Sequence, residues 1–245
     1  MSPHVTLSIA GRVLGQLRRD PRTIALLVVV PSVLMTILRY AFDGQPDTFQ
    51  RIGAPLLGLL PFITMFLVAS IAMLRERTSG TLERLMSMPV GKLDLLAGYG
   101  LAFGLLALIQ TVVLALVSLG PLGLETDRSA LLLVVLAILN ALLGMSLGLF
   151  ISAFATSEFQ AVQFMPAIVL PQLLLCGLFV ARDQMAGWLE AISYLLPLTY
   201  AYDALSLATG AGDLGGEFAR DVIVVGLVTV GALALGAVTM RRRSA

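Results

Sequence analysis

Charged and metal-binding side chains are scarce in this sequence. Only 13% of its 245 residues are charged, the formal net charge is +1, and it contains one histidine, His4, and one cysteine, Cys176. A single histidine near the terminus argues against a serine-histidine nucleophile system and against a zinc site in the apolar part of the chain. A lone cysteine has no disulfide partner, and a near-neutral charge argues against nucleic-acid binding. We therefore expect no catalytic site, no metal site and no nucleic-acid partner.

Apolar residues fill most of the chain. Hydrophobic residues make up 58% of the sequence, and the mean hydropathy is +0.94. A helix needs about 20 apolar residues to cross a hydrocarbon core about 30 Å thick. The predicted fold is all-α, a polytopic membrane protein whose transmembrane domain, 23–240, has six spans: 23–42, 52–74, 95–119, 130–155, 160–181 and 222–240. Little chain is left for a soluble catalytic domain.

Residues 1–22 precede the first span and carry a helical apolar pattern. Val5, Ile9 and Val13 share one face at 100° per residue, whereas Arg12 and Arg18 lie on the other. This pattern predicts an amphipathic helix in the membrane interface. An ordinary terminal tail with chance periodicity is the alternative.

The basic residues are distributed unevenly between the two sides of a six-span chain. Eleven of the 16 Lys and Arg residues fall on the side that holds both termini, including the basic tail 241–245, and five fall on the other. Because basic loops stay on the cytoplasmic side, both termini are predicted to be cytoplasmic.

The longest charged segment on that side, 76–89, lies between the second and third spans. Ser79-Gly80-Thr81 breaks the preceding helix, Leu82, Leu85 and Met86 then recur at helical spacing, and Pro89 ends the pattern. The pattern predicts a short amphipathic helix, which either lies passively under the bilayer or docks a partner.

The connector 182–221 before the last span mixes polar and aromatic residues. Trp188, Tyr194 and Tyr200 are amphipathic rings that favour a membrane boundary, so short interfacial or re-entrant helices are predicted on the external side. Nowhere does the chain carry a phosphate-binding loop. Gly91-Lys92 is followed by Leu93, where such a loop needs Ser or Thr to hold magnesium.

Two motifs resemble the membrane subunit of type-2 ATP-binding-cassette exporters. The first is Glu76-Arg77 followed by Gly80-Thr81-Leu82-Glu83 and Pro89; the second, after the fifth span, is Gly177-Leu178-Phe179 followed by Pro197-Leu198-Thr199-Tyr200. Ala186 stands where that family commonly has proline. Within the family the chain is similar to actinobacterial drug and antibiotic export permeases of the daunorubicin-resistance kind.

The resemblance implies a division of labour between subunits. Separate cytoplasmic ATPase subunits would bind ATP and magnesium, so this chain would need no cofactor of its own. Two permease subunits in the cell membrane, identical or paralogous, would form the pathway for an amphiphilic drug, lipid or lipid-linked product. The substrate itself stays open, and the export direction comes from the family alone.

The resemblance also assigns candidate residues to the contact with the ATPase. The coupling residues would be Glu76, Arg77, Gly80, Thr81, Leu82, Glu83, Arg84, Leu85, Met86 and Pro89. Secondary contacts on the same side would be Arg12, Arg18, Arg19 and Glu158.

Several residues of the second and fifth spans are unusual for purely lipid-facing helices and are candidates for lining the pathway. They are Phe62, Thr64, Met65, Phe66, Ser70, Gln163, Phe164 and Gln172. Simple helix packing is the alternative for each, and Gly144 and Gly148 are expected to let helix backbones approach closely.

Two other functions stay open from the residues alone. A free-standing secondary transporter or channel is disfavoured because the spans lack ionisable groups near their middles. An intramembrane enzyme using Asp203 and Asp213, or a passive scaffold, is the remaining alternative.

Overall fold

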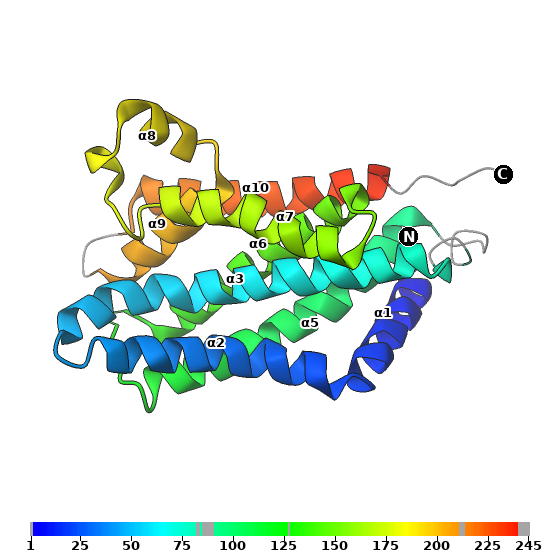
Figure 1. Cartoon of the computed structure of the whole chain (residues 1–245), viewed down its shortest axis with the longest axis horizontal. Helices are drawn as coiled ribbons and strands as arrows, with labels where there is room; N and C mark the ends of the chain where they lie inside the picture. Colours follow the sequence, from blue (N-terminus) through cyan, green and yellow to red (C-terminus); the bar gives the residue numbers. More distant parts are fainter. Residues whose placement is uncertain (1, 82–83, 85–90, 127, 211–213, 240–245) are drawn as a thin grey trace.

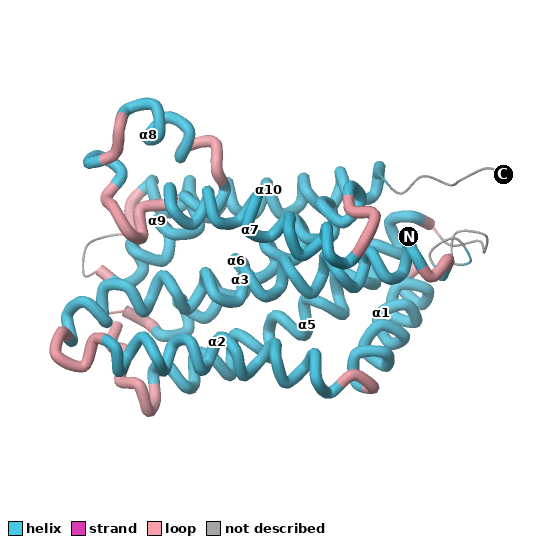
Figure 2. Tube along the Cα trace, in the orientation of Figure 1, coloured by secondary structure: helices cyan, strands magenta, loops and turns pink. Residues whose placement is uncertain are grey.

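The computed structural model describes residues 2–81, 84, 91–126, 128–210 and 214–239, and every regular element within them is helical (Figures 1 and 2). Six of the helices are long and apolar enough to cross a membrane. They are α2 (Pro21–Ala41), α3 (Pro46–Thr78), α5 (Lys92–Leu119), α6 (Ala130–Ile151), α7 (Glu158–Leu175) and α10 (Gly216–Thr239). The prediction of an all-α fold with six spans is confirmed.

Several spans begin or end away from the predicted limits. α3 has 33 residues, about 50 Å at 1.5 Å per residue, because the polar stretches at both ends continue the helix. α7 ends at Leu175 instead of residue 181, since Gly177 adopts a φ of +107° that a helix does not contain. α10 begins at Gly216, six residues before the predicted start.

The shorter helices lie at the two ends of the bundle (Figure 1). α1 (Pro3–Arg18) crosses one end. The last turn of α3, the first turn of α7 and the last turn of α10 lie at the same end. We call this the α1 end. The opposite end carries η2 (Arg182–Gln184), α8 (Gly187–Ser193) and α9 (Pro197–Thr209), whereas η1 (Ser152–Phe154) continues α6 at the α1 end.

The α1 helix confirms the predicted amphipathic pattern, with its apolar face packed on α5. Ile9, Ala10 and Val13 are buried, and a Cβ at Gly98 of α5 would overlap the Ile9 side chain. Leu7 points away and is 64% exposed. Most of the apolar stripe is therefore used inside the subunit, and the position of α1 at a membrane interface stays a prediction.

The connector after α7 has one buried helix and one exposed helix. Leu198, Ala201 and Leu205 of α9 are fully buried, and α9 packs on α3, α6 and α10. By contrast, Trp188 of α8 is 67% exposed. An ion pair of 2.7 Å between Arg182 Nη1 and Asp203 Oδ2 joins the start of the connector to α9.

The most extensive helix contact joins α3 to α6 through glycines. A Cβ at Gly144 would overlap the backbone carbonyl of Phe62, and one at Gly148 would overlap that of Phe66. The expected close approach of the backbones is confirmed at both positions. Small residues allow such contact, which is a principal source of helix association in a bilayer.

We predict that Gly144→Ala lowers thermal stability because the new methyl group has to displace the α3 backbone. Overpacking of this kind costs about 1–3 kcal/mol. Gly231→Ala on α10 is the matched control, since its Cβ would meet nothing within 4 Å and alanine is the better helix former. Thermal unfolding of the purified variants in detergent measures both. Equal melting temperatures for the two variants would refute the proposed tightness of the contact.

Candidate functional site at the α1 end

The predicted coupling residues begin inside α3 and continue beyond it. Glu76 and Arg77 form part of the last turn of α3, which ends at Thr78. Gly80 has a φ of +70°, a conformation that glycine adopts without strain. The Arg84 backbone N–H donates to the Gly80 carbonyl over 3.1 Å. The long helix therefore ends just before Gly80, whose carbonyl accepts a hydrogen bond from the residue four positions later.

Of the remaining predicted coupling residues, the structure describes only Thr81 and Arg84. Thr81 is half-buried, its hydroxyl lies 2.9 Å from the Ser79 hydroxyl, and Arg84 is exposed. Leu82, Glu83, Leu85, Met86 and Pro89 lie outside the described residues. The role of the whole segment in coupling stays a prediction.

A buried ion pair ties the last turn of α3 to α1. Arg12 Nη2 lies 3.2 Å from Glu76 Oε1, and the same nitrogen donates to the Tyr99 hydroxyl of α5 over 2.6 Å. The Glu76 side chain is only 9% exposed, and that of Arg12 is 29% exposed. A buried carboxylate is costly without a cation beside it. Arg12 therefore holds α1, α3 and α5 together at one point, and its predicted contact with an outside partner has to coexist with this role.

The start of α1 is fixed to the start of α5 by Asp94. Asp94 Oδ1 accepts a hydrogen bond of 2.9 Å from the Ser2 backbone N–H and a longer one of 3.5 Å from the Thr6 hydroxyl. Asp94 is buried and lies in the first turn of α5, where an acidic side chain is favoured by the helix dipole. The first turn of α1 is thus anchored by Asp94, and the helix is anchored again at Arg12.

A second, exposed ion pair joins α3 to α7. Arg75 donates from Nε to Glu158 Oε1 over 2.8 Å and from Nη2 to Glu158 Oε2 over 3.1 Å. This bidentate geometry fixes the short turn before α7 against the end of α3. Glu158, predicted as a secondary contact, is therefore placed beside the coupling segment, although its carboxylate is already engaged.

The turn between α1 and α2 presents a carboxylate and two exposed arginines. Asp20 caps α2 by accepting from the Thr23 backbone N–H over 3.2 Å and from its hydroxyl over 2.7 Å. These hydrogen bonds hold the pKa of the Asp20 carboxyl below its ordinary value. Arg18 and Arg19 are exposed immediately before it. Arg77 differs from these residues because its Nε and Nη2 atoms are buried with no hydrogen-bond partner among the described residues.

Most of the predicted pathway residues lie inside the subunit. Four of them are fully buried in α3: Phe62, Met65, Phe66 and Ser70. Gln172 of α7 is 5% exposed, and its amide donates to the Ile168 carbonyl. Thr64 and Phe164 are half-buried and Gln163 is exposed, so these three reach the surface of the subunit. The assignment of all eight residues to a pathway stays a prediction.

Sequence reasoning missed three members of this site. Asp94 and Tyr99 stand at the start of an apolar run and carry no motif, and Arg75 precedes the recognised pattern by one residue. The available signal was the position of polar residues at the very end of a span, where a side chain is expected to find a partner or reach the interface.

The site consists mainly of contacts between helix ends. Two ion pairs, Arg12–Glu76 and Arg75–Glu158, join its helices, whereas Asp20 and Arg77 are in no ion pair among the described residues. The described residues contain no group of three or more His, Cys, Asp or Glu side chains placed to hold a metal. A displacement of residues 79–91 would act on α3 and α5 directly, and on α1 and α7 through the ion pairs.

Comparison with known proteins places this arrangement in a family. The family model described as ABC-2 type transporter matches residues 5–208, which include all but the first two residues of α1, the segment 76–89 and all but the last residue of α9. The chain is 28% identical over 149 residues to the probable multidrug ABC transporter permease YbhS of Escherichia coli strain K12, with 60% of this chain and 40% of YbhS covered.

Two further relatives show similar levels of identity. ABC transporter G family member 20 of Dictyostelium discoideum is 27% identical over 178 residues, covering 72% of this chain and 24% of the relative. The inner membrane transport permease YhhJ of Escherichia coli strain K12 is 26% identical over 168 residues, covering 68% and 44%. The matched part of the chain therefore spans less than half the length of each of these relatives.

We predict that Arg12→Met lowers the free energy of unfolding by on the order of 1–3 kcal/mol, because it leaves the buried Glu76 carboxylate without its cation. Adding Glu76→Gln should recover part of that loss, since the uncompensated charge is then removed. Thermal or denaturant unfolding in detergent measures the two variants.

The exposed pair provides the matched control for that experiment. Arg75→Met should cost about 1 kcal/mol or less, because the side chains of Arg75 and Glu158 are 57% and 53% exposed. If Arg12→Met lowers the free energy of unfolding no more than Arg75→Met does, the Arg12–Glu76 pair contributes no more to stability than an exposed pair.

Proposed function

This chain belongs to the ABC-2 type transporter family as a membrane permease subunit, and we propose that it exports an amphiphilic substrate under the control of a separate ATPase that docks on residues 76–89. The observation that carries the proposal is the continuity of α3 with this segment. One helix of 33 residues runs the length of the bundle and ends two residues before Gly80 of the matched motif. Any force on the segment reaches the membrane part through a rigid element.

The contacts around α3 give that force several paths. The glycine contact makes α6 follow α3, and the ion pairs of Glu76 and Arg75 pass a displacement to α1 and α7. No residue of this chain has to perform covalent chemistry. ATP and magnesium would be bound by the ATPase subunits, and closure of those subunits would move two such segments together.

The pathway would form between two permease subunits, either identical or paralogous. Among the predicted lining residues, Thr64, Gln163 and Phe164 have side chains at the subunit surface and are the first to test. The name of YbhS, a probable multidrug permease, supports a drug as substrate. The narrower similarity to daunorubicin-resistance-like permeases supports the same class. We place the chain in the cell membrane with both termini in the cytoplasm, on the strength of its basic-residue asymmetry.

The coupling segment can be tested by Glu83→Leu, which removes a charge without altering a span. We expect the affinity-tagged wild-type chain, solubilised from its native membrane, to co-purify with an ATPase carrying a Walker A phosphate-binding loop. The variant should lose most of that ATPase while its amount in the membrane is unchanged. Mass spectrometry of the purified material measures the ratio of the two subunits.

Glu125→Leu is the matched control, because Glu125 is exposed in the loop between α5 and α6 at the opposite end of the bundle. It should retain the ATPase. Loss of the ATPase with both variants, or purified chain that moves an amphiphilic dye without any ATPase, would contradict the proposal and favour a free-standing transporter.

Sidedness follows from the same proposal and has its own measurement. In a Cys176→Ser background, Arg84→Cys should react with a membrane-impermeant maleimide only after the cells are permeabilised. Glu125→Cys should react in intact cells. The reverse pattern would place residues 76–89 outside, where no ATP-driven partner can reach them.

A further inference from the structure

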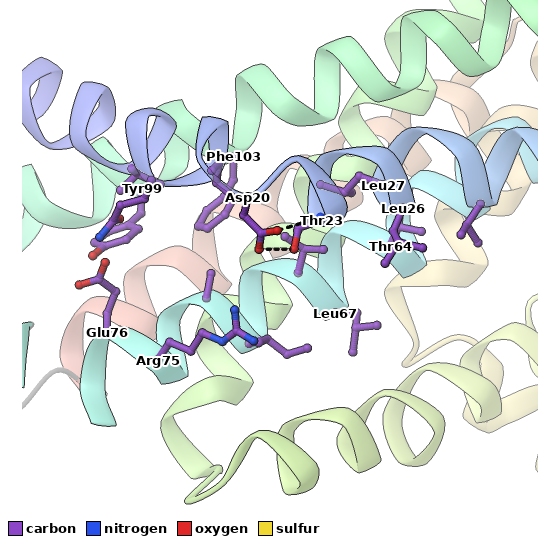
Figure 3. A pocket seen from close by; sticks show the side chains of 17 residues that line it. Asp20, Thr23, Leu26, Leu27, Thr64, Leu67, Arg75, Glu76, Tyr99 and Phe103 are labelled. Atoms are coloured by element: carbon purple, nitrogen blue, oxygen red, sulfur yellow. Dashed lines mark hydrogen bonds between the residues drawn. The ribbon is translucent and has the colours of Figure 1, made fainter. Parts of the chain in front are cut away.

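A cleft lies between α2 and α3 at the α1 end of the bundle (Figure 3). Its volume is about 540 Å³, and its walls come from the end of α1, the first turns of α2, the last turns of α3 and the aromatic side chains of Tyr99 and Phe103. Small-molecule sites typically enclose about 300–1,000 Å³. We call it the α2–α3 cleft.

The cleft is polar at one end and apolar along the rest of its length. Asp20, Arg75 and Glu76 border the polar end, and Figure 3 shows Leu26, Leu27 and Leu67 farther along, toward Thr64. Glu76 follows Thr64 by twelve residues of helix, or about 18 Å at 1.5 Å per residue. That length is close to the thickness of one leaflet, about 15 Å.

The cleft is open toward the surroundings of the spans. Leu26 and Val30 of α2 line it and are 63% and 38% exposed, and both lie within a helix that is long and apolar enough to cross a membrane. An occupant can therefore enter sideways from the hydrocarbon layer with its polar head at the α1 end. This shape favours an amphiphile over a hydrophilic solute.

The charges at the polar end favour a cationic head. Arg12 neutralises Glu76, and Arg75 is held bidentately by Glu158, so these four charges cancel. Asp20 takes part in no ion pair among the described residues, and its hydrogen bonds come from Thr23. The nearby residues Arg18, Arg19 and Arg22 are exposed and do not line the cleft. Among the charged side chains that line the cleft, Asp20 is thus the one outside a salt bridge, and Arg75 acts on it only through space.

We propose that the α2–α3 cleft binds a single amphiphilic amine, with its ammonium group at the Asp20 carboxylate and its hydrocarbon part between α2 and α3. The site lies within one subunit, and Thr64 at its far end is also a candidate for the pathway between two subunits. It does not depend on docking of an ATPase, so it can be tested with the purified chain alone.

The test uses three photoreactive probes with the same diazirine-bearing alkyl chain and different heads: a primary amine, an alcohol and a carboxylate. The chain is reconstituted in nanodiscs made of phosphatidylglycerol and phosphatidylcholine, irradiated, digested and mapped by mass spectrometry. We expect amine adducts to concentrate on residues 13–30 and 64–76 and to exceed alcohol adducts there by about fivefold, as for a partly exposed ion pair. Equal labelling by all three probes, or stronger labelling by the carboxylate, would overturn the proposal.

Asp20→Asn is the decisive variant, because asparagine keeps the cap on Thr23 while it removes the charge. Amine labelling should fall to the level of the alcohol, with an unchanged melting temperature. Asp43→Asn, an exposed acidic position after α2 at the opposite end, is the matched control and should leave labelling unchanged. Unchanged amine labelling in Asp20→Asn would refute the proposal that the Asp20 carboxylate binds the ammonium group.

Two further arms separate the cleft from the general lipid surface and from a lipid ligand. Val68→Trp, which fills the cleft, should abolish labelling, whereas Leu116→Trp on the exposed face of α5 should not. Soluble dodecylamine should compete with the probe. Competition by a soluble short-chain phosphatidylglycerol but not by dodecylamine would show that the cleft holds an anionic membrane lipid, contrary to the proposal.

Discussion

The close contact between the backbones of α3 and α6 is the constraint on which the rest of the structure depends. In a bilayer the lipid chains are as apolar as the side chains, so helices associate where small residues let them pack tightly. Gly144 and Gly148 provide that contact, and 56% and 50% of the residues in the apolar windows of α3 and α6 are buried, against 17% for α2 and for α7. The bundle thus has a rigid inner pair and outer helices that are held by fewer contacts.

Polar interactions at the α1 end supply part of what the outer elements lack. α1 is fixed through Arg12 and through the bonds that Asp94 accepts, and α7 is fixed through Arg75 and Glu158. The two ion pairs differ in their expected contribution to stability. Breaking the buried Arg12–Glu76 pair leaves a buried charge without a partner, which is costly, whereas breaking the exposed Arg75–Glu158 pair leaves charges that water can solvate. Since both pairs include residues of the last turns of α3, one helix end gathers the connections to α1, α5 and α7.

The sequence predicted those features that depend on composition and local pattern. Long apolar runs gave the six spans, and the period of Ile9 and Val13 gave the amphipathic helix α1. Helix ends were harder, because α7 stops at a glycine conformation and α10 starts early with Arg220 neutralising Asp221 over 2.8 Å. Neither effect is visible in hydropathy.

The site was predictable only where a contiguous motif existed. The segment from Glu76 to Pro89 could be recognised, but Arg12 and Glu76 are 64 residues apart, and nothing local marks them as partners. The pathway candidates show the same limit. Phe62 and Phe66 look unusual for a lipid-facing helix, and their burial depends on glycines of α6 about 80 residues later. A single sequence gives residue types and spacing but not which faces of two distant helices meet.

The unequal burial of the helices explains how a cleft and the predicted coupling segment can share one end of the molecule. Arg75 and Glu76 border the α2–α3 cleft and lie in the last turn of α3, where the segment 76–89 begins. Because α3 is locked to α6 and α2 is not locked to either, a displacement of this end changes the spacing of α2 and α3 at smaller cost than any rearrangement of the inner pair. A change in the spacing of α2 and α3 would alter the width of the cleft. By thermodynamic reciprocity, an occupant that favours one cleft width also favours the corresponding position of the segment after α3.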